Sequence, residues 1–166
     1  MENKNDILKN LYSEDPSIKE DAIKAIETNG DLSVVPALFD YLQKSDDKLP
    51  VVKLLSDIKL AGFQGLVIDR LETSPPEILT YLLRVVWESS LDFSDYADTF
   101  VEFLMTKPLE IALEAATVLE NLSFKTAEER ENVIEMLQAT PKHTENQFLI
   151  ENVLEVLTNP IEQEDF

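Results

Sequence analysis

Apolar residues recur along this chain at the spacing of an α-helix. Between residues 16 and 28, Ile18 is followed by apolar positions four, five and eight residues later, and between residues 108 and 122 a step of three or four residues continues over several turns. No stretch alternates between apolar and polar residues for long enough to suggest a sheet. The pattern predicts an all-α fold.

Turn residues divide this pattern into ten expected helices. The Asp15-Pro16 pair places a capping carboxylate before a proline that suits the first helical position, while Asn29-Gly30 and Gly62 supply residues able to take positive φ at helix ends. The expected helices span residues 3–12, 16–28, 33–44, 48–60, 64–73, 76–89, 94–106, 108–122, 127–139 and 143–158. The first and last of them are rich in Lys, Asn and Glu, which predicts polar end caps.

An internal repeat of about thirty residues groups these helices in pairs. A four-residue phrase, consisting of an apolar residue, a usually acidic residue, a variable residue and Leu, ends at Leu11, Leu42, Leu71, Leu104 and Leu137. A second apolar cluster follows each phrase after turn residues, so that five helical hairpins fill the chain. Because one hairpin cannot bury its apolar face alone, the pairs are expected to stack as an α-solenoid. We expect one repeat domain over residues 1–159 and a short acidic C-terminal tail over 160–166.

The first long unit resembles the HEAT-like and armadillo-type helical repeat family. In residues 15–31, Asp15 precedes an aliphatic residue, Lys19 stands where the family usually has Arg, and an Ala, a further aliphatic residue and a Gly-Asp turn follow. The other four units keep the helix pair and lose the Asp and the basic residue, and the Trp, Leu-Gly and Tyr signature of tetratricopeptide arrays does not recur. The resemblance implies a right-handed superhelical stack that binds proteins, with the second helix of each pair lining the concave side.

Charge and composition exclude several function classes. The 166 residues include 33 acidic and 14 basic residues, giving a net charge of -19, and no cysteine. Disulfides, thiolate zinc sites and cysteine nucleophiles are therefore excluded, and the negative field opposes nucleic-acid binding. The charge is -4 over residues 1–60, -6 over 61–106 and -9 over 107–166. A basic partner, if the protein has one, is expected to engage the C-terminal half.

Few residues carry the pattern of a catalytic or metal site. His143 is the single imidazole, which excludes His-based triads and multi-histidine metal sites, and the three glycines form no phosphate-binding loop. Asp92, Asp95 and Asp98 stand three residues apart, either as helix-capping groups, with Ser94 or Asp95 as the cap, or as a site for a hard cation. Capping is the favoured interpretation, and we expect no catalytic residue, no metal and no cofactor.

The expected helix over residues 76–89 carries the most informative polar strip. Apolar residues cover most of its circumference, and Tyr81, Arg84 and Glu88 lie on the remaining arc with Trp87 at its margin. Such a composition in an acidic chain is typical of a protein-binding hot spot. The alternative interpretation is that Trp87 packs against the next repeat and that Arg84 pairs with Glu77 or Glu88.

These observations favour a non-catalytic protein–protein interaction or scaffold module. Two alternatives stay open: an accessory domain or subunit of an enzyme, such as a lyase-like helical-repeat protein, and an acidic nucleic-acid mimic that binds a basic protein. The chain has no apolar run near the roughly 20 residues that span a bilayer and no basic, apolar leader. We therefore expect a cytoplasmic protein with a protein partner and without nucleic-acid, membrane or small-molecule ligands.

Overall fold

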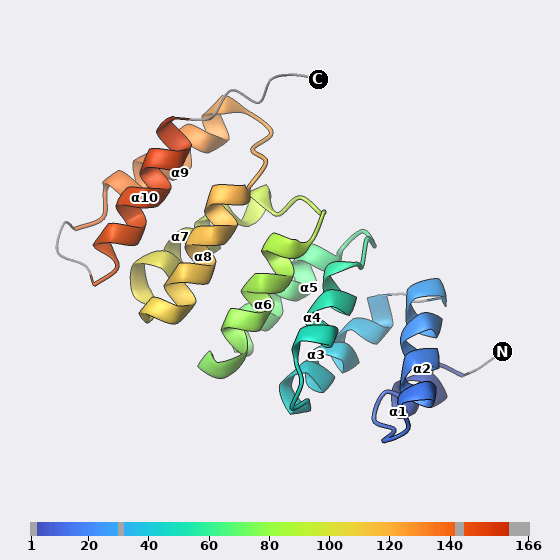
Figure 1. Ribbon diagram of the computed structural model, residues 1–166. Coiled ribbons are helices and arrows are strands. Elements are labelled where there is room, and N and C mark those ends of the chain that lie inside the picture. Colours follow the sequence, from blue (N-terminus) through green and yellow to red (C-terminus); the bar gives the residue numbers. More distant parts are fainter. Residues whose placement is uncertain (1–2, 30–31, 142–144, 160–166) are drawn as a thin grey trace. The chain divides into compact units, whose positions relative to one another are not determined.

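The computed structural model describes residues 3–29, 32–141 and 145–159, and these ranges are helical with short connections (Figure 1). They contain ten α-helices, two short 3₁₀ helices and no strand. The all-α prediction is therefore confirmed for the described part of the chain. No helix in that part combines the length and apolar character needed to cross a membrane.

The chain divides into two compact units, Met1–Leu91 and Asp92–Phe166. The first unit contains α1 (Lys4–Asn10), α2 (Pro16–Asn29), the 3₁₀ turn η1 (Leu32–Val34), α3 (Val35–Lys44), α4 (Leu49–Ser56), α5 (Phe63–Thr73) and α6 (Pro76–Glu88). The second contains η2 (Ser94–Tyr96), α7 (Ala97–Thr106), α8 (Leu109–Asn121), α9 (Ala127–Gln138) and α10 (Gln147–Thr158). The sequence analysis expects one repeat domain over residues 1–159, and the division into two units leaves that expectation a prediction.

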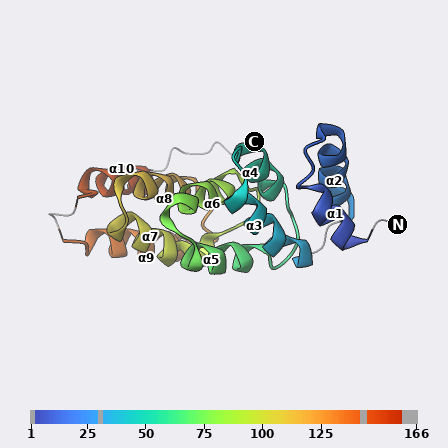
Figure 2. The same ribbon diagram turned by 90° about the horizontal axis from the view of Figure 1, so that it is seen from below.

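In the first unit, helices pack both within and between successive pairs. Contacts join α1 to α2, α3 to α4 and α5 to α6, and further contacts join α3 to α5 and α4 to α6. Figure 2 accordingly shows α4 and α6 in one layer and α3 and α5 in the other. Leu38, Leu55 and Leu83 of this unit are fully buried, so the core lies between the two layers.

An aromatic contact joins the first helix pair to α3. The rings of Tyr12 and Tyr41 meet edge to face with their centres 5.0 Å apart and their planes at 89°. The Lys19 ammonium lies 5.2 Å from the centre of the Tyr41 ring. Both geometries are favourable for an aromatic quadrupole, so Tyr41 receives two stabilising contacts from the α1–α2 pair.

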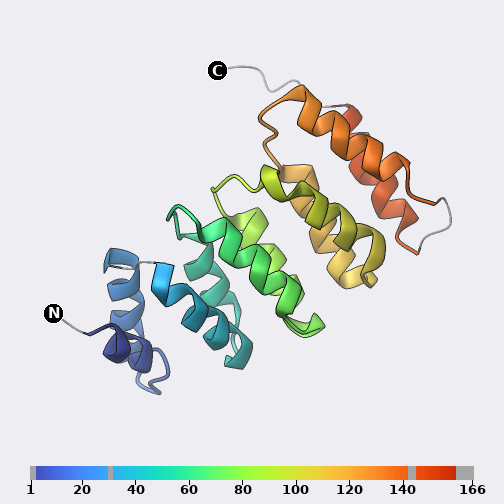
Figure 3. The same cartoon turned by 180° about the vertical axis from the view of Figure 1, so that it is seen from behind.

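The second unit repeats the same arrangement. Contacts join α7 to α8 and α9 to α10, and they also join α7 to α9 and α8 to α10. The view from behind brings α7 and α9 to the front of this unit, with α8 and α10 behind them (Figure 3). Phe100, Leu104 and Leu119 are fully buried between these layers.

Side-chain caps begin several helices, one of them at the Asp15-Pro16 pair expected from the sequence. The Asp15 carboxylate accepts a hydrogen bond from the Ser17 amide at 2.9 Å, and Pro16 begins α2. At α9, the Thr126 hydroxyl accepts from the Glu129 amide at 3.1 Å, and the Glu129 carboxylate accepts from the Lys125 amide at 2.9 Å. These bonds satisfy amides that a helix start leaves without partners.

The expected helix over 48–60 is too long at its C-terminal end. Helix α4 ends at Ser56, because the Ile58 amide donates to the carbonyl three residues earlier, at Leu55, and ends the α-helical pattern. Gly62 does have positive φ, at 92°, yet it precedes α5 rather than ending α4. A Cβ atom there would also lie 3.1 Å from Leu32 Cδ1, so both conformation and space favour glycine.

The last helix also begins later than expected, at Gln147 rather than residue 143. The side chain of Asn146 is buried and its Nδ2 donates to the carbonyl oxygens of Leu104, at 3.0 Å, and Lys107, at 2.7 Å. Asn146 is thus held at the end of α7, and α10 starts directly after it. Gly30 and His143, both named from the sequence, lie outside the described residues.

Replacing Asn146 with Ala should destabilise the protein by roughly 1–3 kcal/mol, because two carbonyl groups at the end of α7 lose their donor. Urea unfolding followed by circular dichroism measures the change. Asn152→Ala is the matched control, since Asn152 is exposed on α10. Equal effects of the two substitutions would contradict the role assigned to Asn146.

Candidate protein-binding surface

Helix α6 carries the residues that the sequence singles out. Its apolar side is fully used in the core, through Ile78, Leu79, Leu82, Leu83, Val85 and Val86. Tyr81, Arg84 and Trp87 are half-buried and Glu88 is exposed, so the predicted polar strip does reach the surface.

Arg84 lies between two of the other candidate residues. Its Nε donates to Glu88 Oε1 at 2.7 Å, and its guanidinium carbon lies 5.6 Å from the centre of the Trp87 ring. The alternative in which Arg84 pairs with Glu88 is therefore confirmed, whereas its binding role stays a prediction. With 41% of the Arg84 side chain exposed, the pair is preorganised and still accessible.

Tyr81 has a neighbour that sequence reasoning missed. The Lys48 ammonium lies 6.0 Å from the centre of the Tyr81 ring and donates to the carbonyl oxygens of Leu42, at 2.8 Å, and Ser45, at 2.7 Å. A lysine just after a helix end commonly binds the last carbonyl groups of that helix, and this position was the available signal. Lys48 therefore contacts both the C-terminal end of α3 and the polar strip of α6.

Arg84 and Glu88 line a surface hollow of about 440 Å³ with residues of α4. Lys53 on α4 and Asp57, directly after its end, also line it and form an ion pair of 3.6 Å, four residues apart like Arg84 and Glu88. Each residue of one pair stands 31 positions from its counterpart in the other pair, close to the sequence repeat of about thirty residues. Two equivalent cation–anion pairs thus face one hollow, and the exposed side chain of Leu49 adds an apolar contact point.

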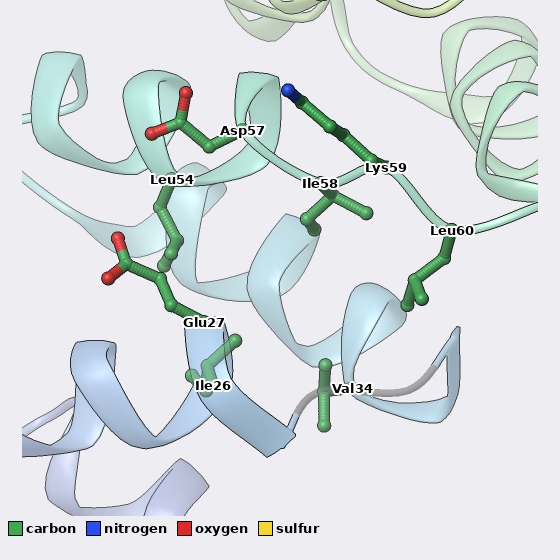
Figure 4. Close-up of a pocket in the computed structure, with 8 residues that line it drawn as sticks. All are labelled: Ile26, Glu27, Val34, Leu54, Asp57, Ile58, Lys59 and Leu60. Atoms are coloured by element: carbon green, nitrogen blue, oxygen red, sulfur yellow. The ribbon is translucent and has the colours of Figure 1, made fainter.

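A second hollow, of about 490 Å³, lies between α2, η1, α4 and the segment that follows α4. Figure 4 shows the carboxylates of Glu27 and Asp57 at one side of it, while Ile58 and Leu60 extend from the connecting segment. The remaining lining residues are Ile26, Val34, Leu54 and Lys59. Four of the lining residues, 57–60, follow the end of α4 at Ser56. The sequence predicts these residues to be part of a longer helix, and the hollow was therefore not expected.

In the acidic run before α7, the side chain that caps the backbone is not one of those expected from the sequence. The Asp92 carboxylate accepts from the Ser94 amide at 2.8 Å, whereas Ser94 and Asp95, the expected caps, make no side-chain cap at η2 or α7. The Lys125 ammonium lies 2.8 Å from Asp95 Oδ1 and 3.7 Å from Asp92 Oδ2. The described residues contain no group of three His, Cys, Asp or Glu side chains suited to a metal ion.

These contacts shift two pKa values. Burial acts to raise the pKa of Asp92, but the hydrogen bonds from Ser94 and the Lys125 charge outweigh it and lower the pKa below 3.8. The hydrogen bond to Asp95 raises the pKa of Lys125 above 10.5. The stabilising effect of Asp92 is therefore complete above pH 3.8 and is lost as the pH falls through its folded pKa.

No protein-family model and no curated protein sequence matches this chain. The function is therefore inferred from the geometry of the surface.

Replacing Asp92 with Asn keeps a capping oxygen but removes the charge that attracts Lys125, so it should lower the free energy of unfolding by about 0.2–1 kcal/mol at pH 7. The difference from the unmodified chain should vanish at a pH well below 3.8, where Asp92 is protonated in both states. Urea unfolding at the two pH values measures it. Glu102→Gln removes one charge from an exposed site on α7 and should show no such difference; a pH-independent loss in Asp92→Asn would refute the assignment.

Proposed function

We propose that this protein is a non-catalytic protein–protein interaction or scaffold module built from HEAT-like repeats arranged as a right-handed α-solenoid. The packing within each unit supports the proposal, because first helices contact first helices and second helices contact second helices of neighbouring pairs. The sequence repeat of about thirty residues, which spans both units, supports it as well. A cytoplasmic location belongs to the proposal and agrees with the absence of cysteine.

The hollow between α4 and α6 is the observation that carries the proposal. Both are second helices of their pairs, which is the position that lines the binding face in the family that the chain resembles. Arg84 lines the hollow, and the half-buried Trp87 lies against the Arg84 guanidinium; Arg and Trp are residue types that dominate protein interfaces when a partner removes them from water. Because Arg84 is already held by Glu88, binding would cost less side-chain entropy than it would for an unrestrained arginine.

The double variant Tyr81→Ala and Arg84→Ala should abolish capture of the partner from native cell extract and leave the helical circular dichroism intact. Both side chains are half-buried at the surface, so their loss removes contact area without opening the core. Affinity capture followed by mass spectrometry measures the partner. The control Lys44→Ala removes one positive charge from an exposed position at the end of α3.

Full capture by the double variant would dismiss the α4–α6 hollow as the binding surface. Equal loss in Lys44→Ala would show that net charge, rather than this surface, determines binding.

A further inference from the structure

Four large apolar side chains are exposed on the second helices of the second unit. Leu109 and Leu113 on α8 are 46% and 51% exposed, and Phe148 and Val156 on α10 are 53% and 43% exposed. The polar end cap expected for the last helix is therefore only part of its surface. Exposed apolar residues that gather on one face, unlike scattered ones, are typical of interaction sites.

These four residues lie on one face of the second unit. Helices α8 and α10 contact each other, and α7 and α9 cover the opposite side of the pair (Figure 2). Leu109 and Leu113 are four residues apart and Phe148 and Val156 are eight apart, so on each helix the two exposed apolar residues form one row, with Asn152 between them on α10. The sides of α8 and α10 that meet their neighbours are occupied by other residues, namely Ile111, Ala112, Ala115, Ala116, Val118, Leu119, Leu149, Ile150, Val153 and Leu157.

The charge around these rows has a single sign. Helix α8 carries three Glu residues and α10 carries two, and neither helix contains a Lys or an Arg. They are Glu110, Glu114, Glu120, Glu151 and Glu155. Over residues 92–166, 17 acidic residues stand against 4 basic ones, a net charge of -13.

We propose that the α8–α10 face binds a basic amphipathic helix of a partner protein. The apolar rows would receive the apolar face of that helix, and the surrounding Glu residues would pair with its Lys and Arg side chains. Helix α8 is about 20 Å long, and a further helix can pack along α8 and α10 at the usual separation of about 8–10 Å. A second copy of this chain would bring two strongly negative faces together, and residues 160–166 of the chain are themselves acidic.

This proposal goes beyond the α4–α6 hollow, because it names a different surface and the chemistry of its partner. A synthetic peptide of about 18 residues, with Leu and Lys placed at the helical period, is the probe. Titration of the full chain with this peptide, by calorimetry and circular dichroism, should show binding with a gain of helix. A peptide of the same composition in scrambled order should bind at least about tenfold more weakly, and a Leu/Glu peptide should not bind.

Surface variants locate the binding. Leu113→Gln combined with Phe148→Gln should weaken peptide binding by about tenfold or more, whereas Met136→Gln, an exposed apolar residue on α9, should leave it within about twofold. Glu151→Gln with Glu155→Gln should weaken binding and reduce its salt dependence. The matched pair Glu131→Gln and Glu135→Gln has the same spacing on the exposed side of α9 and should weaken binding less.

Three results would overturn the proposal: equal binding of the scrambled peptide, equal weakening by the α9 variants, or concentration-dependent self-association that Leu113→Gln with Phe148→Gln abolishes. The variant Tyr81→Ala with Arg84→Ala should bind the peptide normally. Failure of the α4–α6 hollow as a binding surface therefore leaves this proposal standing, and the reverse also holds.

Discussion

The inability of one helical hairpin to bury its own apolar side determines the rest of this structure. Four of the helix pairs pack on a partner pair in their unit, and these contacts run between helices of the same rank, α3 with α5 and α4 with α6, or α7 with α9 and α8 with α10. The fully buried Leu83 and Leu119 mark where these contacts close the core. Stability in such an arrangement arises mainly from interfaces between neighbours, which leaves the outer side of the second helices available for other uses.

Much of the fold could be predicted from sequence because helix starts depend on local chemistry. The Asp15-Pro16 pair and Thr126 act on amides within three residues, and a local signal of that kind survives any tertiary context. The C-terminal end of α4 and the start of α10 could not be predicted. Asn146 is positioned by hydrogen bonds to carbonyl groups about 40 residues away in the sequence. The sequence near residue 146 does not indicate these partners.

The contacts of the candidate surface also fall into predictable local ones and unpredictable long-range ones. Arg84, Trp87 and Glu88 lie within one helical turn, so their mutual contacts follow from helix geometry and were predictable. The contributions of Lys48, Lys53 and Asp57 come from other helices and depend on how α4 and α6 pack. The exposed rows on α8 and α10 escaped prediction because apolar residues at helical spacing ordinarily indicate a core, and only the packing reveals which of them stay uncovered.

The side chain of Asn146 also bears on how the second unit folds. Its bonds to Leu104 and Lys107 span 42 and 39 residues, whereas most contacts of a helical pair are local. Such long-range bonds require both helix pairs of the unit to be in place. Separation of the two pairs removes both hydrogen bonds at once, so Asn146 makes the stability of each pair depend on the presence of the other.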